Sequence, residues 1–252
     1  MSDAVDLNAD LGEGAPTDEA LLGVITSANV ACGGHAGDEE MMRRTVRLAG
    51  ERGVGVGAHP SYPDREGFGR RVVPMTPARL TEILAGQIRV LRDIAASEGV
   101  PLQHVKAHGA LYNLAVRDDA VADAIGRAML IVDASLIGVA LAGAPMGDVF
   151  ARLGLRVVRE AFVDRGYLAD GTLVPRDRPG ALLTDPVRAS ARAVGMIRSG
   201  RVMSVDGIEA SVDAQTLCLH ADTPGSAAIA SATRRALEEA GIRVIVMREL
   251  PT

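Results

Sequence analysis

Short apolar runs alternate with amphipathic stretches along the whole chain. The runs carry few polar residues, which is typical of parallel strands that are covered on both faces. In the stretches between them, apolar residues repeat on one face, as they do in helices that pack on a sheet. The runs that predict strands lie at residues 5–11, 25–31, 54–58, 104–107, 136–140, 156–160, 216–220 and 243–247.

Several of the predicted helices begin and end at recognisable residues. A threonine or aspartate before a proline is typical of a helix start, because the side chain caps free backbone N–H groups and proline fits the first turn. A glycine after the last turn is typical of a helix end. Helices are predicted in this way from Thr76-Pro77, Asp185-Pro186 and Thr223-Pro224 to near Gly99, Gly200 and Gly241.

The alternation of strands and helices leaves two architectures, a (β/α) barrel and an open doubly wound sheet. Asp6, Asn8 and Asp10 alternate with apolar residues and therefore share one face of the first predicted strand. The following strands are apolar on both faces, so this polar face is better placed inside a barrel than in solvent. We therefore predict a distorted (β/α) barrel of seven or eight strands, formed as a single domain by residues 1–252.

Composition narrows the class of protein. The chain has 252 residues, 48% of them hydrophobic and 23% charged, which is typical of a globular protein with a sizeable core. Its net charge of -5 and the absence of a basic tail argue against nucleic acid and anionic membranes as partners. Cys32 and Cys218 give no disulfide framework, and the first residues show no signal-peptide pattern, so we expect a cytoplasmic protein.

The stretch from residue 129 to residue 147 is apolar enough to resemble a membrane span. Asp133 and Ser135 interrupt it, and Gly143 and Pro145 break its second half. We therefore interpret it as the end of a helix, a turn and the buried strand at 136–140, and we expect no membrane partner.

Polar residues gather where the predicted strands end. The carboxyl ends of the strands in βα proteins meet at one edge, where active sites lie. Four of the five histidines lie at or just past such an end, whereas His104 begins its strand and is predicted to be structural. The polar residues at these ends are Asp10, Glu13, Asn29, His35, Asp38, His59, Lys106, His108, Glu160, Asp164, Arg165, His220 and Asp222.

Five of the six aromatic residues also lie in these predicted loops. The core is therefore expected to be aliphatic, and the rings are suited to the wall of a pocket for a small apolar or ring-shaped ligand. Packing within the loops is the alternative for any one ring. These residues are Tyr62, Phe68, Tyr112, Phe162 and Tyr167.

Lys106 is the only lysine in the chain, and every other residue among the 27 lysines and arginines is an arginine. Lysine carries a compact ammonium group, whereas the planar guanidinium of arginine is larger. The position of Lys106 in a predicted buried strand favours a role at the site, where it would hold negative charge on an oxyanion or a phosphate. His108 would share its strand face. A buried ion pair with a carboxylate is the alternative for Lys106.

Two further groups of residues have more than one interpretation. Asp10, His35 and His59 are suited to binding a metal ion, but no HxxxH or CxxC spacing supports one, so a metal is not predicted. Arg70 and Arg71 follow a glycine-rich loop and are suited to binding a carboxylate or phosphate. A solvated surface position is an equally good interpretation for Arg71.

Six stretches of the chain together resemble the lactam utilisation (LamB/YcsF) family of 5-oxoprolinase A subunits. None of them is specific alone, but they span nearly the whole chain. Ala107, Val163 and Ala221 stand where the family usually has proline, alanine and glycine, and none of these changes removes a polar candidate. The stretches are DLNADLGEG (6–14), ITSANVACGGHAGD (25–38), GAHPSYPDREGFGRR (57–71), VKAHGALYN (105–113), EAFVDRGYLADGTL (160–173) and CLHADTP (218–224).

The resemblance implies a barrel of the glycoside hydrolase/deacetylase kind, in agreement with the predicted fold. It also implies ATP-dependent opening of 5-oxo-L-proline to L-glutamate, with ATP as co-substrate and two partner subunits. The chain has no GxxxxGK[ST] phosphate-binding loop, so the partners are expected to carry much of the ATP chemistry. This chain is then expected to bind and hydrolyse the phosphorylated lactam.

The predicted site residues fall into two groups. The predicted catalytic residues are Asp10, His35, His59, Lys106, His108 and Glu160. The predicted substrate-binding residues are Asn8, Glu13, Asn29, Asp64, Arg70, Tyr112, Asp164, Arg165, His220 and Asp222. Two alternative functions stay open: a metal-dependent deacetylase or amidohydrolase on the same barrel, and a non-catalytic lactam-binding subunit.

Overall fold

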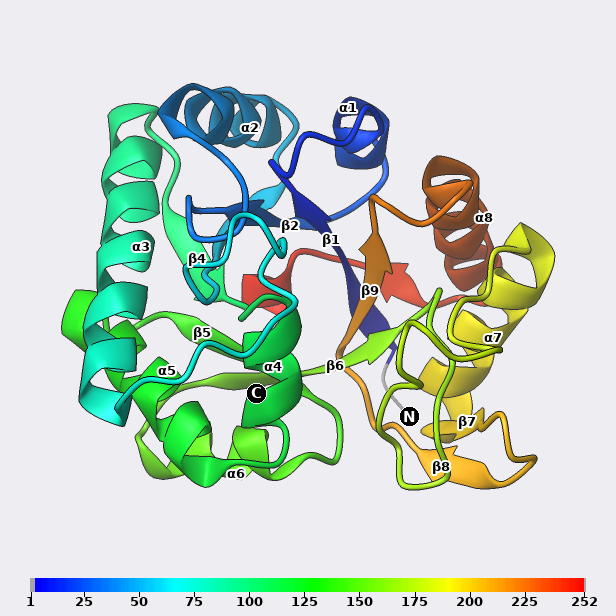
Figure 1. Cartoon of the computed structure of the whole chain (residues 1–252). Coiled ribbons are helices and arrows are strands. Elements are labelled where there is room, and N and C mark those ends of the chain that lie inside the picture. The colour runs from blue at the N-terminus through cyan, green and yellow to red at the C-terminus, as the bar shows by residue number, and fades with distance from the viewer. Residues whose placement is uncertain (1–2, 252) are drawn as a thin grey trace.

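Strands and helices alternate along residues 3–251, the part of the chain that the computed structural model describes (Figure 1). The strands are β1 (Ala4–Leu11), β2 (Ser27–Ala31), β3 (Gly55–His59), β4 (Leu102–Val105), β5 (Ile137–Leu141), β6 (Val157–Phe162), β7 (Arg201–Met203), β8 (Glu209–Ser211), β9 (Thr216–His220) and β10 (Arg243–Val244). The helices are α1 (Asp18–Leu22), α2 (Glu39–Glu51), α3 (Pro77–Ser97), α4 (Gly109–Ala115), α5 (Asp119–Val132), α6 (Pro145–Arg152), α7 (Pro186–Ser199) and α8 (Ser226–Glu239).

Seven parallel strands of the described chain close into a barrel. Their order is β1-β2-β3-β4-β5-β6-β9, and β9 pairs back with β1 from Asp6↔Thr216 to Asp10↔His220. Helices surround these strands, with α2 and α3 on one side and α7 and α8 on the other (Figure 1). The predicted distorted (β/α) barrel is therefore confirmed, with seven strands in the closed ring.

The prediction of a barrel strand at residues 243–247 is wrong. Only β10 forms there, and it pairs with Ala4 and Val5 at the start of β1. From Asp6 onwards β1 pairs with β9, so β10 finds free backbone groups only before that residue. The chain then turns into a 3₁₀ helix at Met247–Glu249.

The predicted helix starts are confirmed in two of the three cases. The side chains of Thr76 and Asp185 accept backbone N–H groups at the first turns of α3 and α7. Thr223 does not cap α8, which begins after Gly225 in the left-handed conformation at φ 78°. The hydroxyl of Thr223 instead donates to Asp164 Oδ2 (2.6 Å).

The short antiparallel pair β7–β8 was not predicted. Each strand has three residues, too few to show a clear alternation of apolar and polar positions. Only Val202 and Ala210, at the middle of each strand, are buried. This pair lies outside the barrel, so β9 follows β6 directly in the closed ring.

The apolar stretch 129–147 folds as predicted, into the end of α5, a turn and β5. Among the described residues, no helix combines the length and the apolarity that crossing a membrane would require.

Candidate active site

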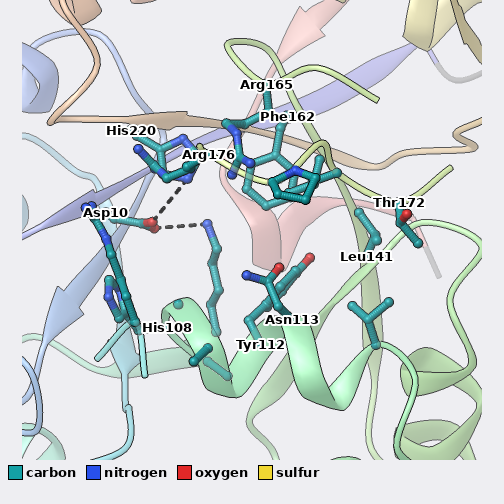
Figure 2. Close-up of a pocket in the computed structure, with 18 of the residues that line it drawn as sticks. Asp10, His108, Tyr112, Asn113, Leu141, Phe162, Arg165, Thr172, Arg176 and His220 are labelled. Carbon is teal, nitrogen blue, oxygen red and sulfur yellow. Dashed lines mark hydrogen bonds and ion pairs between the residues drawn. The ribbon is translucent and has the colours of Figure 1, made fainter. Parts of the chain in front are cut away.

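The carboxyl ends of the barrel strands surround a cavity of about 670 Å³ (Figure 2). This volume lies in the range of sites for small organic ligands. Strand ends form its inner part, and α4 and the segment 165–176 form its outer wall. The predicted site residues that line it are Asp10, Glu13, His59, Arg70, Lys106, His108, Tyr112, Arg165, His220 and Asp222.

The polar face of β1 points into the barrel beneath this cavity. Asn8 donates from Nδ2 to Thr216 Oγ1 (2.7 Å) and to Glu160 Oε1 (3.1 Å), and its Oδ1 accepts from Asn29 Nδ2 (2.7 Å). His104 is the third residue of β4 and not its first, as was predicted, but its Nε2 donates to Asn29 Oδ1 (2.8 Å), which agrees with a structural role. All five residues are buried. This network therefore orients the strand ends above it instead of lining the cavity.

Asp6 lies at the deep end of the same face and is fully buried. It accepts hydrogen bonds from Ser27 Oγ (2.5 Å), Thr216 Oγ1 (2.5 Å) and Thr26 Oγ1 (2.8 Å). Burial raises the pKa of Asp6 to about 6, although these hydroxyl groups act in the opposite direction. The folded protein therefore binds a proton at Asp6 that the unfolded chain releases at lower pH.

A pH-dependent stability follows from Asp6. Since its pKa is higher in the folded protein than in the unfolded chain, the stabilisation is complete below the unfolded value of 3.8 and is lost as the pH rises through about 6. The difference corresponds to about 3 kcal/mol. We expect Asp6→Asn to remove this component of the pH dependence when urea unfolding is followed from about pH 4 to about pH 7. The exposed Asp206→Asn is the control, and parallel stability curves for Asp6→Asn and wild type would contradict the prediction.

Lys106 directly follows β4 and is 2% exposed. Its Nζ lies 2.9 Å from Asp10 Oδ1, 2.9 Å from Glu160 Oε1 and 2.9 Å from Cys218 Sγ. Burial alone would lower the pKa of Lys106, but the surrounding groups, Asp10 foremost, hold it well above its ordinary value. Lys106 thus forms a buried ion pair and also faces the cavity. The buried ion pair and the position at the site, given above as alternatives for Lys106, therefore occur together.

Asp10 connects Lys106 to two histidines. Its Oδ1 accepts from Lys106 and from Asn29 Nδ2 (2.8 Å). Its Oδ2 lies 3.4 Å from His59 Nε2 and 4.0 Å from His220 Nε2, and Figure 2 draws the contact with His220. Burial alone would raise the pKa of Asp10, but His59 and Lys106 hold it well below its ordinary value. A carboxylate that stays charged is a weak base, so Asp10 is better suited to positioning its neighbours.

Tyr112 and Phe162 form one wall of the inner cavity. The hydroxyl of Tyr112 donates to Glu160 Oε2 (2.9 Å), and burial, followed by the nearby Glu160, raises the pKa of Tyr112 well above its ordinary value. The Phe162 ring stacks on His220 with centroids 5.4 Å apart, and Lys106 Nζ lies 5.1 Å from its centroid. The prediction that both aromatic residues lie in loops is wrong, because Tyr112 belongs to α4 and Phe162 ends β6.

Asp164 and His220 form a carboxylate–imidazole pair at the cavity. His220 Nδ1 lies 3.0 and 3.1 Å from the two oxygens of Asp164, which also accept the His220 backbone N–H and the Thr223 hydroxyl. Burial would raise the pKa of Asp164, but His220 and Thr223 lower it to about 2. Because the carboxylate only accepts, Nδ1 carries the proton and Nε2 faces the cavity. This arrangement is suited to general acid–base catalysis.

A second group of imidazoles surrounds the carboxylate of Glu13. Glu13 Oε1 lies 2.8 Å from His35 Nε2, 3.2 Å from His108 Nδ1 and 3.8 Å from His59 Nε2. The His35 and His108 rings stack with centroids 3.6 Å apart. Burial lowers the pKa of His35 to about 4 and also lowers that of His108. Burial opposes the charge on His59 as well, but Asp10 and Glu13 raise its pKa.

Arginines dominate the outer rim of the cavity. Arg70 Nη2 and Arg176 Nη1 lie 2.6 and 3.3 Å from Asp222 Oδ2. Arg165 is buried and donates to the carbonyls of Val174 and Ala181. Guanidinium groups pair well with carboxylates and phosphates, so this rim is suited to an anionic ligand. Arg117 lines the cavity too.

Apart from α4, the outer wall comes from one continuous segment, residues 163–185 between β6 and α7. Isolated bridges join Arg165 to Leu182 and Tyr167 to Leu173. Further backbone hydrogen bonds run from Leu168 to Thr172 and from Val174 to Gly166. The segment therefore holds its shape largely through its own backbone.

The predicted residue Asp64 does not join the cavity. Its carboxylate pairs with the guanidinium of Arg71 and accepts the backbone N–H of Gly67, within the same turn. Asp38, another polar residue after a strand end, caps α2 by accepting the backbone N–H of Met41. His35, Asn8, Asn29, Glu160 and Asp164 lie behind the residues that line the cavity.

Several residues of the site were not predicted from the sequence, among them Cys218, Arg117 and Arg176. Cys218 contacts Lys106 and precedes His220 by two positions on β9, so the strand period placed it on the same face. Arg117 and Arg176 line the cavity from irregular segments, where no periodic pattern marks the direction of a side chain. Of the described residues, two groups offer converging ligand atoms for a metal ion: Glu13, His35, His59 and His108, and Asp10, Cys218 and His220.

The inner cavity combines a buried ammonium group, two carboxylates beside it and an imidazole whose outer nitrogen is free to exchange a proton. Such a set is suited to stabilising negative charge on a carbonyl or phosphoryl oxygen while a proton moves to or from a reacting group. Hydrolysis of an amide-type bond in a small anionic molecule fits these groups and the arginine rim.

Known proteins named as A subunits of 5-oxoprolinase are similar to this chain over nearly its whole length. A 5-oxoprolinase A subunit from Chloroflexus aggregans is 49% identical over 246 residues, which cover 96% of this chain and 98% of the relative. A 5-oxoprolinase A subunit from Pyrococcus horikoshii is 44% identical over 250 residues, which cover 97% of this chain and 98% of the relative.

Solved structures confirm the class of barrel. A lactam utilization protein from Thermus thermophilus superposes with a TM-score of 0.90 at 43% identity, covering 97% of this chain and all of that one. A T48 deacetylase shares the fold alone, with a TM-score of 0.51 at 13% identity over 98% of this chain and 89% of its own. The LamB/YcsF family model matches residues 5–252, and the chain belongs to that family.

Proposed function

We propose that this chain is the A subunit of an ATP-dependent 5-oxoprolinase and opens the activated ring of 5-oxo-L-proline to L-glutamate. The observation that carries the proposal is the inner cavity, where Lys106 Nζ and His220 Nε2 lie on either side of Asp10. Relatives named as A subunits of 5-oxoprolinase, at 44% and 49% identity, support the same substrate and the existence of further subunits.

Activation is needed because a lactam is an amide. Resonance stabilises its C–N bond, and the carbonyl carbon is a poor electrophile. Transfer of the terminal phosphoryl group of ATP to the carbonyl oxygen removes this resonance. The chain lacks a GxxxxGK[ST] loop, so we assign much of the phosphoryl transfer to two partner subunits.

The arginine rim and Lys106 would each bind a different anionic group of the activated ring. The rim holds Arg70, Arg165 and Arg176 and is suited to the α-carboxylate. Lys106, deeper in the cavity, is suited to the phosphorylated oxygen, where an ammonium group stabilises developing negative charge. The wall of Tyr112 and Phe162 would pack against the ring.

His220 would move the proton. Its Nε2 takes a proton from water as the oxygen adds to the phosphorylated carbon, and Asp164 stabilises the resulting imidazolium. The same proton then passes to the ring nitrogen as the C–N bond breaks, which leaves an acyl phosphate. A second water replaces the phosphate, and glutamate and inorganic phosphate are released.

The proposal predicts that the isolated chain has little or no 5-oxoproline-dependent ATP hydrolysis. Without a phosphate-binding loop of its own, it is expected to wait for a substrate that its partners activate. Release of phosphate and of glutamate should be measured for the purified chain, for the partner subunits and for the mixture. Full activity should require the mixture, and vigorous glutamate release by this chain with ATP alone would contradict the proposal.

A further inference from the structure

The tautomers of His59 and His108 are fixed by backbone carbonyl groups. His59 Nδ1 lies 2.7 Å from the carbonyl oxygen of Lys106, and His108 Nε2 lies 2.9 Å from that of Phe68. A carbonyl oxygen only accepts hydrogen bonds, so both of these nitrogens carry hydrogen. In the neutral rings the remaining nitrogens, His59 Nε2 and His108 Nδ1, present lone pairs, although, against the effect of burial, Asp10 and Glu13 raise the pKa of His59 and so favour a proton there.

These two lone pairs face one another and a carboxylate. His59 Nε2 and His108 Nδ1 are only 3.0 Å apart, and Glu13 Oε1 lies 3.2 Å from the His108 nitrogen and 3.8 Å from the His59 nitrogen. None of the three atoms has a proton to offer the others in these tautomers. Three largely buried acceptors at such distances repel one another unless a proton or a metal ion lies between them.

The spacing of the three atoms fits a metal ion. A single point at about 2.0–2.1 Å from each of them exists, which is the ordinary bond length of zinc to imidazole nitrogen and carboxylate oxygen. We propose that Glu13, His59 and His108 form a binding site for a divalent transition-metal ion of the zinc class. This inference goes beyond the proposed function, because it requires neither a lactam nor a partner subunit.

Each proposed ligand has a further contact that orients it, as ligands of bound metals do. The Lys106 and Phe68 carbonyls hold the two imidazoles, and His35 Nε2 holds Glu13 Oε1 at 2.8 Å. Among the described residues, Phe68 is the only non-glycine with a positive φ (54°). That strained conformation places its carbonyl on His108, and such strain persists where the surrounding structure enforces it.

The second group of candidate ligand atoms is a weaker candidate. In the group of Asp10, Cys218 and His220, the ammonium of Lys106 already lies 2.9 Å from both Asp10 Oδ1 and Cys218 Sγ. A metal ion there would be repelled by this cation. Around Glu13, all three proposed ligands line the cavity, so the ion would keep an open position towards a ligand.

Metal content and affinity test the inference without any activity assay. The untagged, metal-stripped full chain should be titrated with zinc chloride by calorimetry, and its zinc content measured after gel filtration. We expect about one zinc per chain. Glu13→Gln and His108→Asn should lose this binding, and His35→Ala should weaken it by about 10- to 100-fold, as loss of an outer contact does.

His220→Asn and Cys218→Ser are the matched controls, because they change the other candidate group and leave Glu13, His59 and His108 intact. Both should bind zinc like the wild type, and near-UV circular dichroism should show that every variant is folded. The inference is overturned if the wild-type chain binds no more zinc than folded His108→Asn, which would mean that a proton joins the two imidazoles. It is equally overturned if the two control variants lose the ion.

Discussion

Lys106→Met is expected to lower the free energy of unfolding by about 3–5 kcal/mol, the usual result of removing one member of a buried ion pair. The methionine keeps most of the length of the side chain, so the loss comes from charge. Without the ammonium, the carboxylates of Asp10 and Glu160 would face each other across the barrel interior with no cation at 2.9 Å from either. Chemical unfolding of the two proteins at neutral pH measures the difference.

A double variant separates the ion pair from packing. In Lys106→Met/Glu160→Gln one unpaired carboxylate becomes a neutral amide, whose oxygen can still accept from Asn8 while its NH2 group donates to the hydroxyl oxygen of Tyr112. Part of the lost stability should therefore return, and the double-mutant cycle should show an interaction between the two sites. Strictly additive losses would mean that the charge of Glu160 does not depend on Lys106.

Lys106→Met should also slow the complete enzyme complex by about 100-fold or more, as removal of one group that stabilises an oxyanion does. The two effects are measured separately, because activity is assayed well below the unfolding transition. A variant that is less stable but fully active would restrict Lys106 to the ion pair.

His220→Asn is expected to lower kcat of the complete complex by about 10²- to 10⁴-fold, the range for loss of a general acid–base group. The asparagine cannot exchange a proton, although its amide can still meet Asp164. KM for 5-oxoproline should change little, because the arginine rim stays intact. Glutamate release by the complex of this chain with its partners gives both constants.

Thr223→Val is the control for His220→Asn. It removes the hydroxyl that donates to Asp164 (2.6 Å) but leaves both contacts between that carboxylate and the imidazole. We expect its kcat to fall by less than about tenfold, since the proton-transfer group is retained. Undiminished turnover in His220→Asn would instead indicate a subunit that binds the lactam without taking part in catalysis.

The barrel could be predicted from sequence because its strands are marked by local pattern. The alternation of Asp6, Asn8 and Asp10 with apolar residues indicates a strand with one polar face, and that face does lie inside the closed ring. The pairing of residues 243–247 could not be predicted in the same way. There, the outcome depends on β9 occupying the edge of β1, which is a tertiary contact between segments far apart in the chain.

The sequence indicated which residues belong to the site better than it indicated which of them contact one another. Strand ends indicated Asp164 and His220 separately, but their contact spans 56 positions and requires β9 to follow β6 past the β7–β8 pair. Asp64 shows the opposite error, a residue that was predicted to belong to the site but does not line the cavity. Its loop also looks like part of a site in the sequence, yet a nearby arginine in the same turn takes up its carboxylate.

Because much of the outer wall is one segment that is hydrogen-bonded mainly to itself, two parts of the site are expected to tolerate evolutionary change differently. The reacting groups sit at strand ends and share one hydrogen-bonded network, so a substitution there disturbs several partners together. Residues 163–185 contribute much of the wall and are tied mainly to their own backbone. Exchange of this segment as a cassette, with Asp164, Arg165 and Arg176 retained, would let related barrels, natural or engineered, admit rings of other sizes while they keep the same reacting groups.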